Sequence, residues 1–121
     1  MENLEGLTLE EKERLLRVRK RIQLLEAKDT IKSNFLSFVK YVWPDFIEGS
    51  HHKKINDAFN RLSRGEIKRL IINMPPRHTK SEFASFLLPA WMIGKNPQLK
   101  IIQATHTADL AVDFGRKTKN L

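Results

Sequence analysis

The chain has 121 residues, which suits one domain or part of one, and its 40% hydrophobic content favours a globular over a disordered chain. It contains no cysteine, which excludes disulfides and thiolate zinc sites, and no apolar run approaches the roughly 20 residues needed to span a bilayer. The formal net charge of +8 favours polyanionic partners such as DNA, with a merely solvated basic surface as the alternative.

The first predicted element is a charged helical arm over residues 1–29. Thr8 and Glu11 have the spacing of a capping box, which predicts a helix that continues to about Lys28. One face of this helix carries a narrow apolar stripe, made of Leu15, Val18, Ile22 and Leu25. The other faces are strongly basic, which indicates a solvated surface or, alternatively, a contact with DNA. Residues 27–30 are expected to form a short joint.

The second predicted domain, residues 30–121, begins with two helices. Ser33 is the predicted N-cap of the first helix, which ends by Pro44 because the residue before a proline resists the helical conformation. Ser50 is the predicted N-cap of the next helix, and Gly65 is predicted to end it in the usual position after the last turn.

The stretch around Lys80 predicts a phosphate-binding loop. Residues 70–72 have the β-branched, apolar character of a buried strand, and the two prolines that follow end any ladder or helix. Lys80 and Ser81 then lead into apolar residues at helical spacing. Strand, tight loop, Lys-Ser and helix is the order of elements in a P-loop. The alternative is that the prolines end a strand and that Thr79 or Ser81 caps a helix.

The loop departs from the usual P-loop pattern at two positions. Met74 and Thr79 stand where G-x-x-x-x-G-K-[ST] has its glycines. The free N–H groups of the following helix and the charge of Lys80 would still attract phosphate, and Arg77 is predicted to compensate for the N–H groups that the prolines lack. If the backbone of Thr79 needs a positive φ, its β-branched side chain would cost on the order of 1–3 kcal/mol.

The helix after the loop is predicted to be interrupted. Pro89 falls inside its apolar pattern and would remove the hydrogen bond to the Ser85 carbonyl, which predicts a kink or a division of the helix. Trp91 is predicted to lie in the core.

A second buried strand is predicted at residues 100–104, parallel to the first through a right-handed crossover. Thr105 and His106 follow it, at the edge where open α/β sheets bind ligands. The alternative, which we rank higher, is that they form the capping turn of a helix over residues 108–117.

The loop and its surroundings resemble a known family. The segment M-P-P-R-H-T-K-S-E, residues 74–82, is similar to the variant Walker A loop of large terminase subunits, the DNA-packaging motors of tailed phages. The blocks that agree around it are R-G-E-I-K-R-L-I-I-N before the loop, and L-P-A-W and K-I-I-Q-A-T-H-T-A-D-L-A after it. The resemblance covers residues 35–121, and the agreement of several ordered blocks makes it far more specific than a lone G-K-S.

The resemblance implies an α/β fold, namely the N-terminal part of a P-loop NTPase in which helices flank a parallel sheet. It implies an ATPase that uses ATP and Mg²⁺ to package double-stranded DNA into procapsids, and that in full-length form also cuts DNA. The implied partners are the small terminase subunit, the portal protein and further copies in a ring, with no membrane. The implied place of action is the cytoplasm of the infected or lysogenic bacterial host.

The resemblance also assigns ATP binding to seven consecutive residues. These are Pro75, Pro76, Arg77, His78, Thr79, Lys80 and Ser81. Among them Arg77 and Lys80 would make the catalytic contacts with phosphate, and the Ser81 hydroxyl would bind Mg²⁺.

Two further pairs of residues receive functions from the resemblance. His51 or His52 would hold the adenine ring, with ordinary packing at the start of a helix as the alternative. A shared metal ion is not expected there, because adjacent helical residues point about 100° apart. Thr105 and His106 would contact DNA or couple it to the nucleotide.

No predicted strand after the loop ends in Asp-Glu, so the Walker B acid and the nuclease domain of the family are missing from this sequence. We therefore expect a fragment that lacks ATP turnover and is marginally stable by itself. Two alternatives remain, a helicase-like P-loop ATPase that acts on nucleic acid and a non-catalytic basic DNA-binding module.

Overall fold

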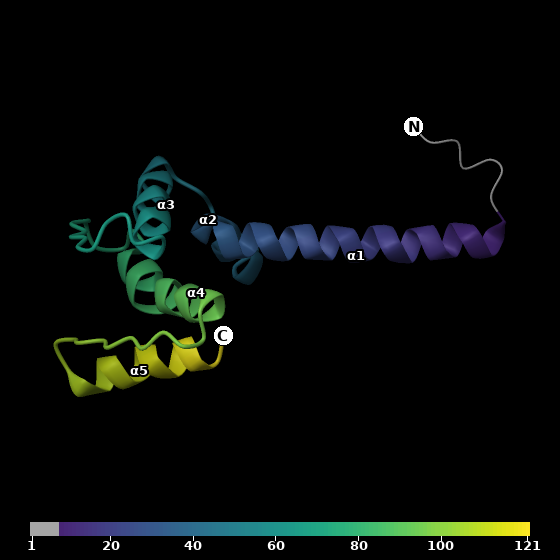
Figure 1. Ribbon diagram of the computed structural model, residues 1–121. Coiled ribbons are helices and arrows are strands. Elements are labelled where there is room, and N and C mark those ends of the chain that lie inside the picture. The colour runs from purple at the N-terminus through teal and green to yellow at the C-terminus, as the bar shows by residue number, and fades with distance from the viewer. Residues whose placement is uncertain (1–7) are drawn as a thin grey trace. The chain divides into compact units, whose positions relative to one another are not determined.

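The computed structural model describes residues 8–121, and this part of the chain is helical. The elements in order are α1 (Leu9–Ser33), α2 (Phe35–Val42), α3 (Ser50–Ser63), the π-helix η2 (Glu82–Leu87), α4 (Leu88–Lys95) and α5 (Ala108–Lys119) (Figure 1). The chain divides into two units between Thr30 and Ile31, close to the predicted boundary between residues 29 and 30. Among the described residues, no helix is both long enough and apolar enough to cross a membrane.

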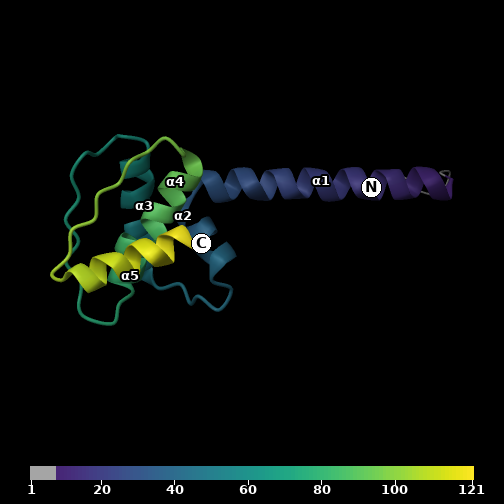
Figure 2. The same ribbon diagram turned by 90° about the horizontal axis from the view of Figure 1, so that it is seen from below.

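The predicted α/β fold is wrong, because the described residues form no sheet. The two segments predicted as strands, residues 70–72 and 100–104, run as irregular coil without a strand arrow (Figure 2). No backbone–backbone hydrogen bond joins either segment to another part of the described chain. Parallel pairing is weak per residue, and a sheet of only two short strands is at best marginally stable. The β-branched character of these segments therefore does not suffice to make a ladder.

Helix α1 begins as predicted but continues further. The Thr8 backbone N–H donates to the Glu11 carboxylate at 2.8 Å, and the Glu11 N–H donates to the Thr8 hydroxyl at 3.3 Å, which confirms the capping box. The predicted joint at residues 27–30 is wrong, since the helix runs through it to Ser33. Ala27 and Lys28 are good helix formers, and the Thr30 hydroxyl is accommodated by donating to the Glu26 carbonyl at 2.8 Å.

The N-terminus of α2 is held by asparagines. Asn34, and not the predicted Ser33, is its N-cap, and its side chain accepts the Ser37 N–H. Two more amide side chains from α3 complete the cap. Asn60 accepts the Phe35 N–H at 3.0 Å, and Asn56 accepts the Leu36 N–H at 2.8 Å. These side chains satisfy backbone donors that a helix cannot pair by itself, and they fix α2 against α3.

The ends of α3 follow the prediction to within one residue. Its N-cap is Gly49, with Ser50 as the first helical residue. At the other end Gly65 has a φ of 76°, its N–H donates to the Leu62 carbonyl at 3.0 Å, and the Glu66 N–H donates to the Arg61 carbonyl at 3.0 Å. This pair of bonds is a Schellman motif, which confirms the predicted stop at Gly65.

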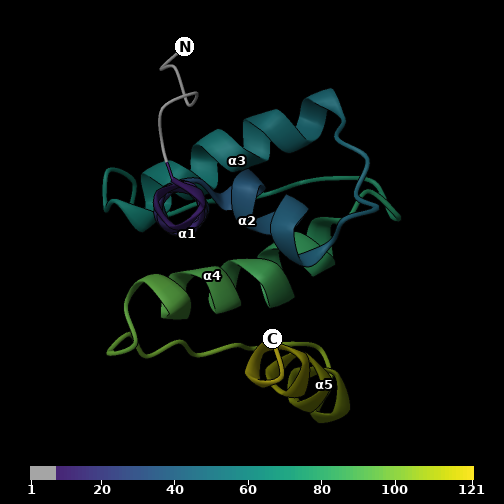
Figure 3. The same ribbon diagram turned by 90° about the vertical axis from the view of Figure 1, so that its right-hand side faces the viewer.

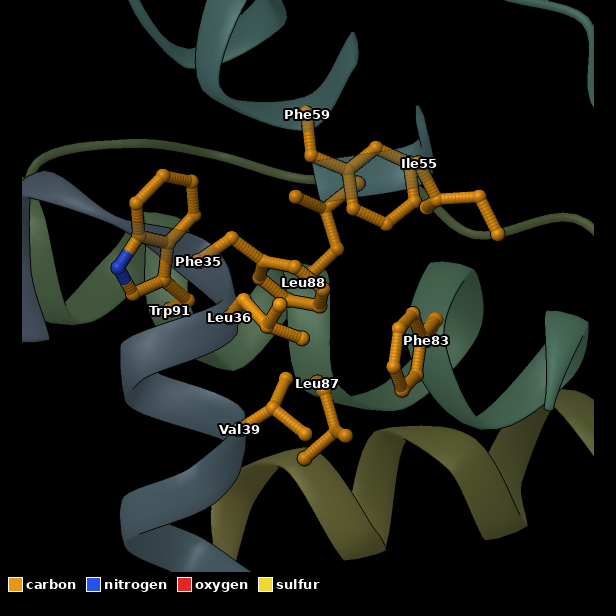
Figure 4. Close-up of a cluster of buried hydrophobic side chains, with 9 residues drawn as sticks. All are labelled: Phe35, Leu36, Val39, Ile55, Phe59, Phe83, Leu87, Leu88 and Trp91. Carbon is orange, nitrogen blue, oxygen red and sulfur yellow. The ribbon is translucent and has the colours of Figure 1, made fainter. Parts of the chain in front are cut away.

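The core of the second unit is built around Phe35, which is fully buried (Figure 4). Its ring makes edge-on contacts with Phe59 at 4.9 Å, with Phe83 at 5.3 Å and with Trp91 at 5.6 Å between centroids. Trp91 is buried as predicted, and its indole N–H donates to the Ile31 carbonyl at 2.9 Å. Helix α4 lies between the α2–α3 pair and α5 (Figure 3). The aromatic cluster holds α2, α3, η2 and α4 together.

The predicted interruption near Pro89 takes the form of a π-helix. The Leu88 N–H donates to the Phe83 carbonyl, five residues back, and α4 starts with Leu88 and Pro89 in its first turn. Pro89 has no N–H for the Ser85 carbonyl. The Gln103 side chain, from the segment that leads to α5, donates its amide N–H to that carbonyl at 2.5 Å instead. Through this hydrogen bond, the interrupted helix holds the segment that follows α4.

Candidate functional site: the loop before Lys80

The residues singled out by the sequence motif surround one pocket. Residues 74–82 line an open cavity of about 450 Å³. This volume lies in the range of about 300–1,000 Å³ that is usual for small-molecule sites. The pocket brings together all seven residues of the predicted ATP-binding loop, and its lining includes the start of the helix that carries Phe83 into the core.

The backbone of the loop turns sharply through two left-handed residues. Arg77 has a φ of 63° and Thr79 a φ of 60°, and they are the only non-glycine residues with positive φ in the described chain. The helical backbone begins directly afterwards at Lys80, and the Phe83 N–H donates to the Thr79 carbonyl at 2.9 Å. The backbone of Thr79 thus has the positive φ that the P-loop pattern suggested, and its β-branched side chain makes this conformation strained.

The charged and hydroxyl side chains of the loop are available to a ligand. Arg77, Lys80 and Ser81 are exposed, and within the described residues their side chains make no hydrogen bond or ion pair with protein. Glu82, the only carboxylate that lines the pocket, lies 3.9 Å from the Lys117 ammonium on α5. The pocket is therefore lined by net positive charge at the N-terminus of a helix, a combination that attracts anions.

His52 connects α3 to the loop through a chain of hydrogen bonds. Its Nδ1 accepts the Gly49 N–H at 2.8 Å, so the neutral ring carries its proton on Nε2. Nε2 lies 2.8 Å from the Thr79 hydroxyl, which in turn donates to the His78 carbonyl at 2.6 Å. Both ring nitrogens are thus occupied within the protein. The sequence gives no direct signal for this pair, since the two residues are 27 positions apart.

The environment of His52 favours its neutral form. Burial lowers the pKa of His52 below its ordinary value of 6.5, and the nearby imidazoles of His51 and His78 lower it further, while Glu48 acts in the opposite direction. The ring is only 5% exposed and contacts the rings of Phe46 at 4.8 Å and Phe83 at 5.1 Å. A neutral ring is also what the hydrogen bond from Gly49 requires, because a protonated Nδ1 cannot accept.

The predicted contact of His51 or His52 with adenine stays a prediction. The ring edge of His52 is already engaged, whereas His51 lines a second cavity of about 290 Å³ between α3 and residues 70–74. Of the two, His51 is therefore better placed to meet a planar base. Its Nε2 is buried without a hydrogen-bond partner among the described residues.

Thr105 and His106 lie directly before Thr107, the N-cap of α5. The Thr105 hydroxyl donates to the Thr107 carbonyl at 2.6 Å, and the Thr107 hydroxyl accepts the Leu110 N–H at 3.4 Å as the N-cap of α5. This geometry is the capping turn that was the preferred alternative from the sequence. Neither residue lines the loop pocket, and their contact with DNA stays a prediction.

A Mg²⁺ ion at this site would depend on a bound nucleotide. In the part of the chain that the structure describes, no group of three or more His, Asp or Glu side chains could hold a metal ion. Mg²⁺ is often bound through one or two protein oxygens together with substrate phosphates. The exposed Ser81 hydroxyl at the first helical turn fits that sparse protein contribution.

Comparisons of the chain with protein-family models, with curated proteins and with solved structures find no match. What the site can do is therefore argued from its own geometry and from the sequence motif. The residues that sequence reasoning missed are those that support the loop from elsewhere, namely His52 through Thr79 and Gln103 through Ser85. A hint was present in Thr79 itself, because a β-branched residue at a glycine position requires support.

Proposed function

We propose that the loop of residues 75–81 binds the phosphates of ATP, and that the chain is the amino-terminal part of a phage terminase large subunit. The observation that carries the proposal is the left-handed turn at Arg77 and Thr79 directly before the helix that starts at Lys80. This turn brings unpaired helix N–H groups and two unengaged cations to one cavity of about 450 Å³. The terminase-like blocks on both sides of the loop support the particular family.

Each residue of the loop has a defined task in this proposal. Lys80 would contact the β- and γ-phosphates as a compact charge, and the Arg77 guanidinium would clamp a phosphate oxygen pair where the prolines offer no N–H. The Ser81 hydroxyl would supply one ligand to Mg²⁺, which when bound neutralises phosphate charge. Binding without turnover is expected, because the one carboxylate of the pocket, Glu82, lies beside Lys117.

In the proposed motor, double-stranded DNA is the cargo and the bacterial host cytoplasm is the place of action. The net charge of +8 supports a polyanionic partner. The small subunit, the portal protein and further copies in a ring remain partners that the resemblance alone suggests.

A basic DNA-binding module without nucleotide is the second candidate. The observation that favours it is the exposed basic surface of α1, which includes Arg14, Arg17, Arg19, Lys20 and Arg21. Such a surface would bind DNA mainly through phosphate contacts, with strong salt dependence. In this candidate the turn before Lys80 would have no ligand.

The deciding experiment is titration of the full chain with a fluorescent ATP analogue and Mg²⁺. We expect saturable binding that Lys80→Ala weakens by at least about tenfold, since a hydrogen bond to a charged group is worth about 1.5–3 kcal/mol and tenfold in affinity is about 1.4 kcal/mol. Lys119→Ala, on the exposed last turn of α5, is the matched control and should leave the affinity unchanged. Binding of DNA with no nucleotide binding, or equal effects of the two substitutions, would favour the second candidate.

A further inference from the structure

The loop contains a residue that its own conformation disfavours. Thr79 has a φ of 60°, in the region that glycine enters freely and that β-branched residues almost never adopt. An isolated loop with threonine at this position would leave the left-handed region for most of the time. Since the helix starts at the next residue, such a change would also redirect the N–H groups and the side chain of Lys80.

The structure shows what opposes that change. The Thr79 hydroxyl lies 2.8 Å from His52 Nε2 and donates to the neighbouring His78 carbonyl at 2.6 Å, so both sides of the hydroxyl are fixed. Rotation of the Thr79 backbone out of the left-handed region would carry the hydroxyl away from at least one of these partners.

His52 itself is held in one orientation. Its Nδ1 accepts the Gly49 N–H at 2.8 Å, and its ring packs against Phe46 and against Phe83, which belongs to the aromatic core. The charged and titratable groups that face the ring are His51 on the same helix, Glu48 before it and His78 on the loop. A buried ring with a fixed tautomer is a rigid point from which to hold a loop.

We propose that His52 is a positioning residue that replaces the missing glycine of the loop by holding Thr79 in the left-handed conformation. This inference rests on the proposed nucleotide site for its consequence, the orientation of Lys80 toward phosphate. The hydroxyl of Thr79 is therefore not a ligand of the nucleotide but the contact through which α3 sets the shape of the loop.

The test is a double-mutant cycle on the full chain, read out by affinity for a fluorescent ATP analogue with Mg²⁺. His52→Ala should weaken binding by about fivefold or more, the effect expected from loss of one neutral hydrogen bond. In the Thr79→Gly background the same substitution should change the affinity by less than about twofold, because glycine needs no support at this φ. Equal effects of His52→Ala in both backgrounds would overturn the inference.

A second set of variants avoids disturbance of the buried ring. Thr79→Val keeps the shape and removes the hydroxyl, so it should weaken binding as His52→Ala does, whereas Thr79→Ser should restore most of what Thr79→Val loses. Thr118→Val is the matched control, because the Thr118 hydroxyl is buried without a partner among the described residues. Equal affinities of the Thr79→Val and wild-type chains would also overturn the inference.

The cycle also separates this inference from the proposed function. Urea unfolding of the His52→Ala, Thr79→Val and double variants needs no ligand and should show non-additive losses. Non-additive losses in a chain that binds no nucleotide would retain the His52–Thr79 contact and refute the nucleotide site. Additive losses in a chain that does bind nucleotide would refute the contact and retain the site.

Discussion

Thr79 carries a β-branched side chain at a φ of 60°, directly before the residue on which phosphate binding is proposed to depend. Backbone strain of this kind costs about 1–3 kcal/mol, and contacts with the surrounding structure must offset this cost. The sequence indicated this position as the weak point of the loop, because the P-loop pattern has glycine there. The structure adds the support that the strain requires.

We expect Thr79→Gly to tighten nucleotide binding by roughly five- to tenfold, which corresponds to the lower part of the strain energy. The reason is that glycine occupies the left-handed region freely, so more molecules hold the loop in its phosphate-binding shape. The measurement is the dissociation constant of a fluorescent ATP analogue. Thr79→Ala is the control, because it removes the hydroxyl but keeps the Cβ, and its affinity should not exceed that of the wild type. Unchanged or weaker binding by Thr79→Gly would contradict the prediction.

His52 makes the stability of the protein depend on pH. Its pKa in the folded chain lies below 6.5, mainly because of burial, so the unfolded chain binds the proton more readily than the folded one. Stability is then fully present above about pH 6.5 and falls as the pH drops below that value. We expect the urea midpoint to decrease between about pH 7.5 and pH 5.5, and less so in His52→Ala. A midpoint with the same pH dependence in both proteins would show that other groups cause it.

Single residues were predictable where the signal is local. Thr8 and Glu11, three residues apart, form the capping box of α1. Gly65 ends α3 with a positive φ, and the loop residues 75–81 line one pocket. The contact between His52 and Thr79 was not predictable, because hydrogen-bond partners 27 residues apart depend on how the helices pack. For the same reason the sequence could not show that His52 has no free ring nitrogen for a base.

At the scale of elements, the helix after the loop owes its form to Pro89. Pro89 cannot donate to the Ser85 carbonyl, the turn before it widens into η2, and the Gln103 side chain donates an N–H to that carbonyl. The sequence predicted the interruption at this place. It did not predict the π-helix or the role of Gln103, because which side chain reaches an open carbonyl is decided by tertiary structure.

Gln103→Leu should destabilise the chain by about 1–3 kcal/mol, because the partly buried Ser85 carbonyl loses the side-chain N–H that Gln103 donates to it. The free energy of unfolding in urea measures this loss. Pro89→Ala should restore part of it in the double variant, since an alanine N–H at that position can donate to the Ser85 carbonyl.

Gln98→Leu is the matched control for this pair, because Gln98 is exposed and its side chain makes no hydrogen bond within the described residues. It should leave the free energy of unfolding within about 0.5 kcal/mol of the wild type. If Gln98→Leu and Gln103→Leu cost the same, the contact with Ser85 contributes nothing measurable.

At the scale of the whole molecule, the sequence predicted most of the helices correctly, but its prediction of a parallel sheet was wrong. Residues 70–72 and 100–104 have strand-like composition, but a ladder depends on partner strands and not on composition alone. Ile71 and Ile102 face water, at 87% and 96% exposure, whereas Leu70 and Ile72 are half-buried against the helical core. The centre of the core is helical, because Phe35 packs against Phe59, Phe83 and Trp91 without a sheet beside them.

Because of these exposed isoleucines, we expect concentration-dependent self-association of the chain, since burial of exposed apolar surface between copies is favourable. The double variant Ile71→Lys, Ile102→Lys should remain monomeric to higher concentration, as measured by light scattering. Its free energy of unfolding should change little, because neither side chain is buried.

Phe59→Ala is the contrasting variant, and the loss of a fully buried ring should cost about 3–5 kcal/mol. An unchanged onset of association in the lysine variant would point to another surface.

The absence of ladder bonds in the two coil segments has a consequence for labile hydrogens. An N–H in a helix is protected until the helix opens, whereas one that faces solvent without an acceptor trades its hydrogen for deuterium almost at once. In heavy water, residues 67–74 and 100–104 should therefore gain mass within the earliest time points, while the middle of α3, next to Phe35, should lag far behind. Slow uptake across either segment would mean that these amides find acceptors in solution.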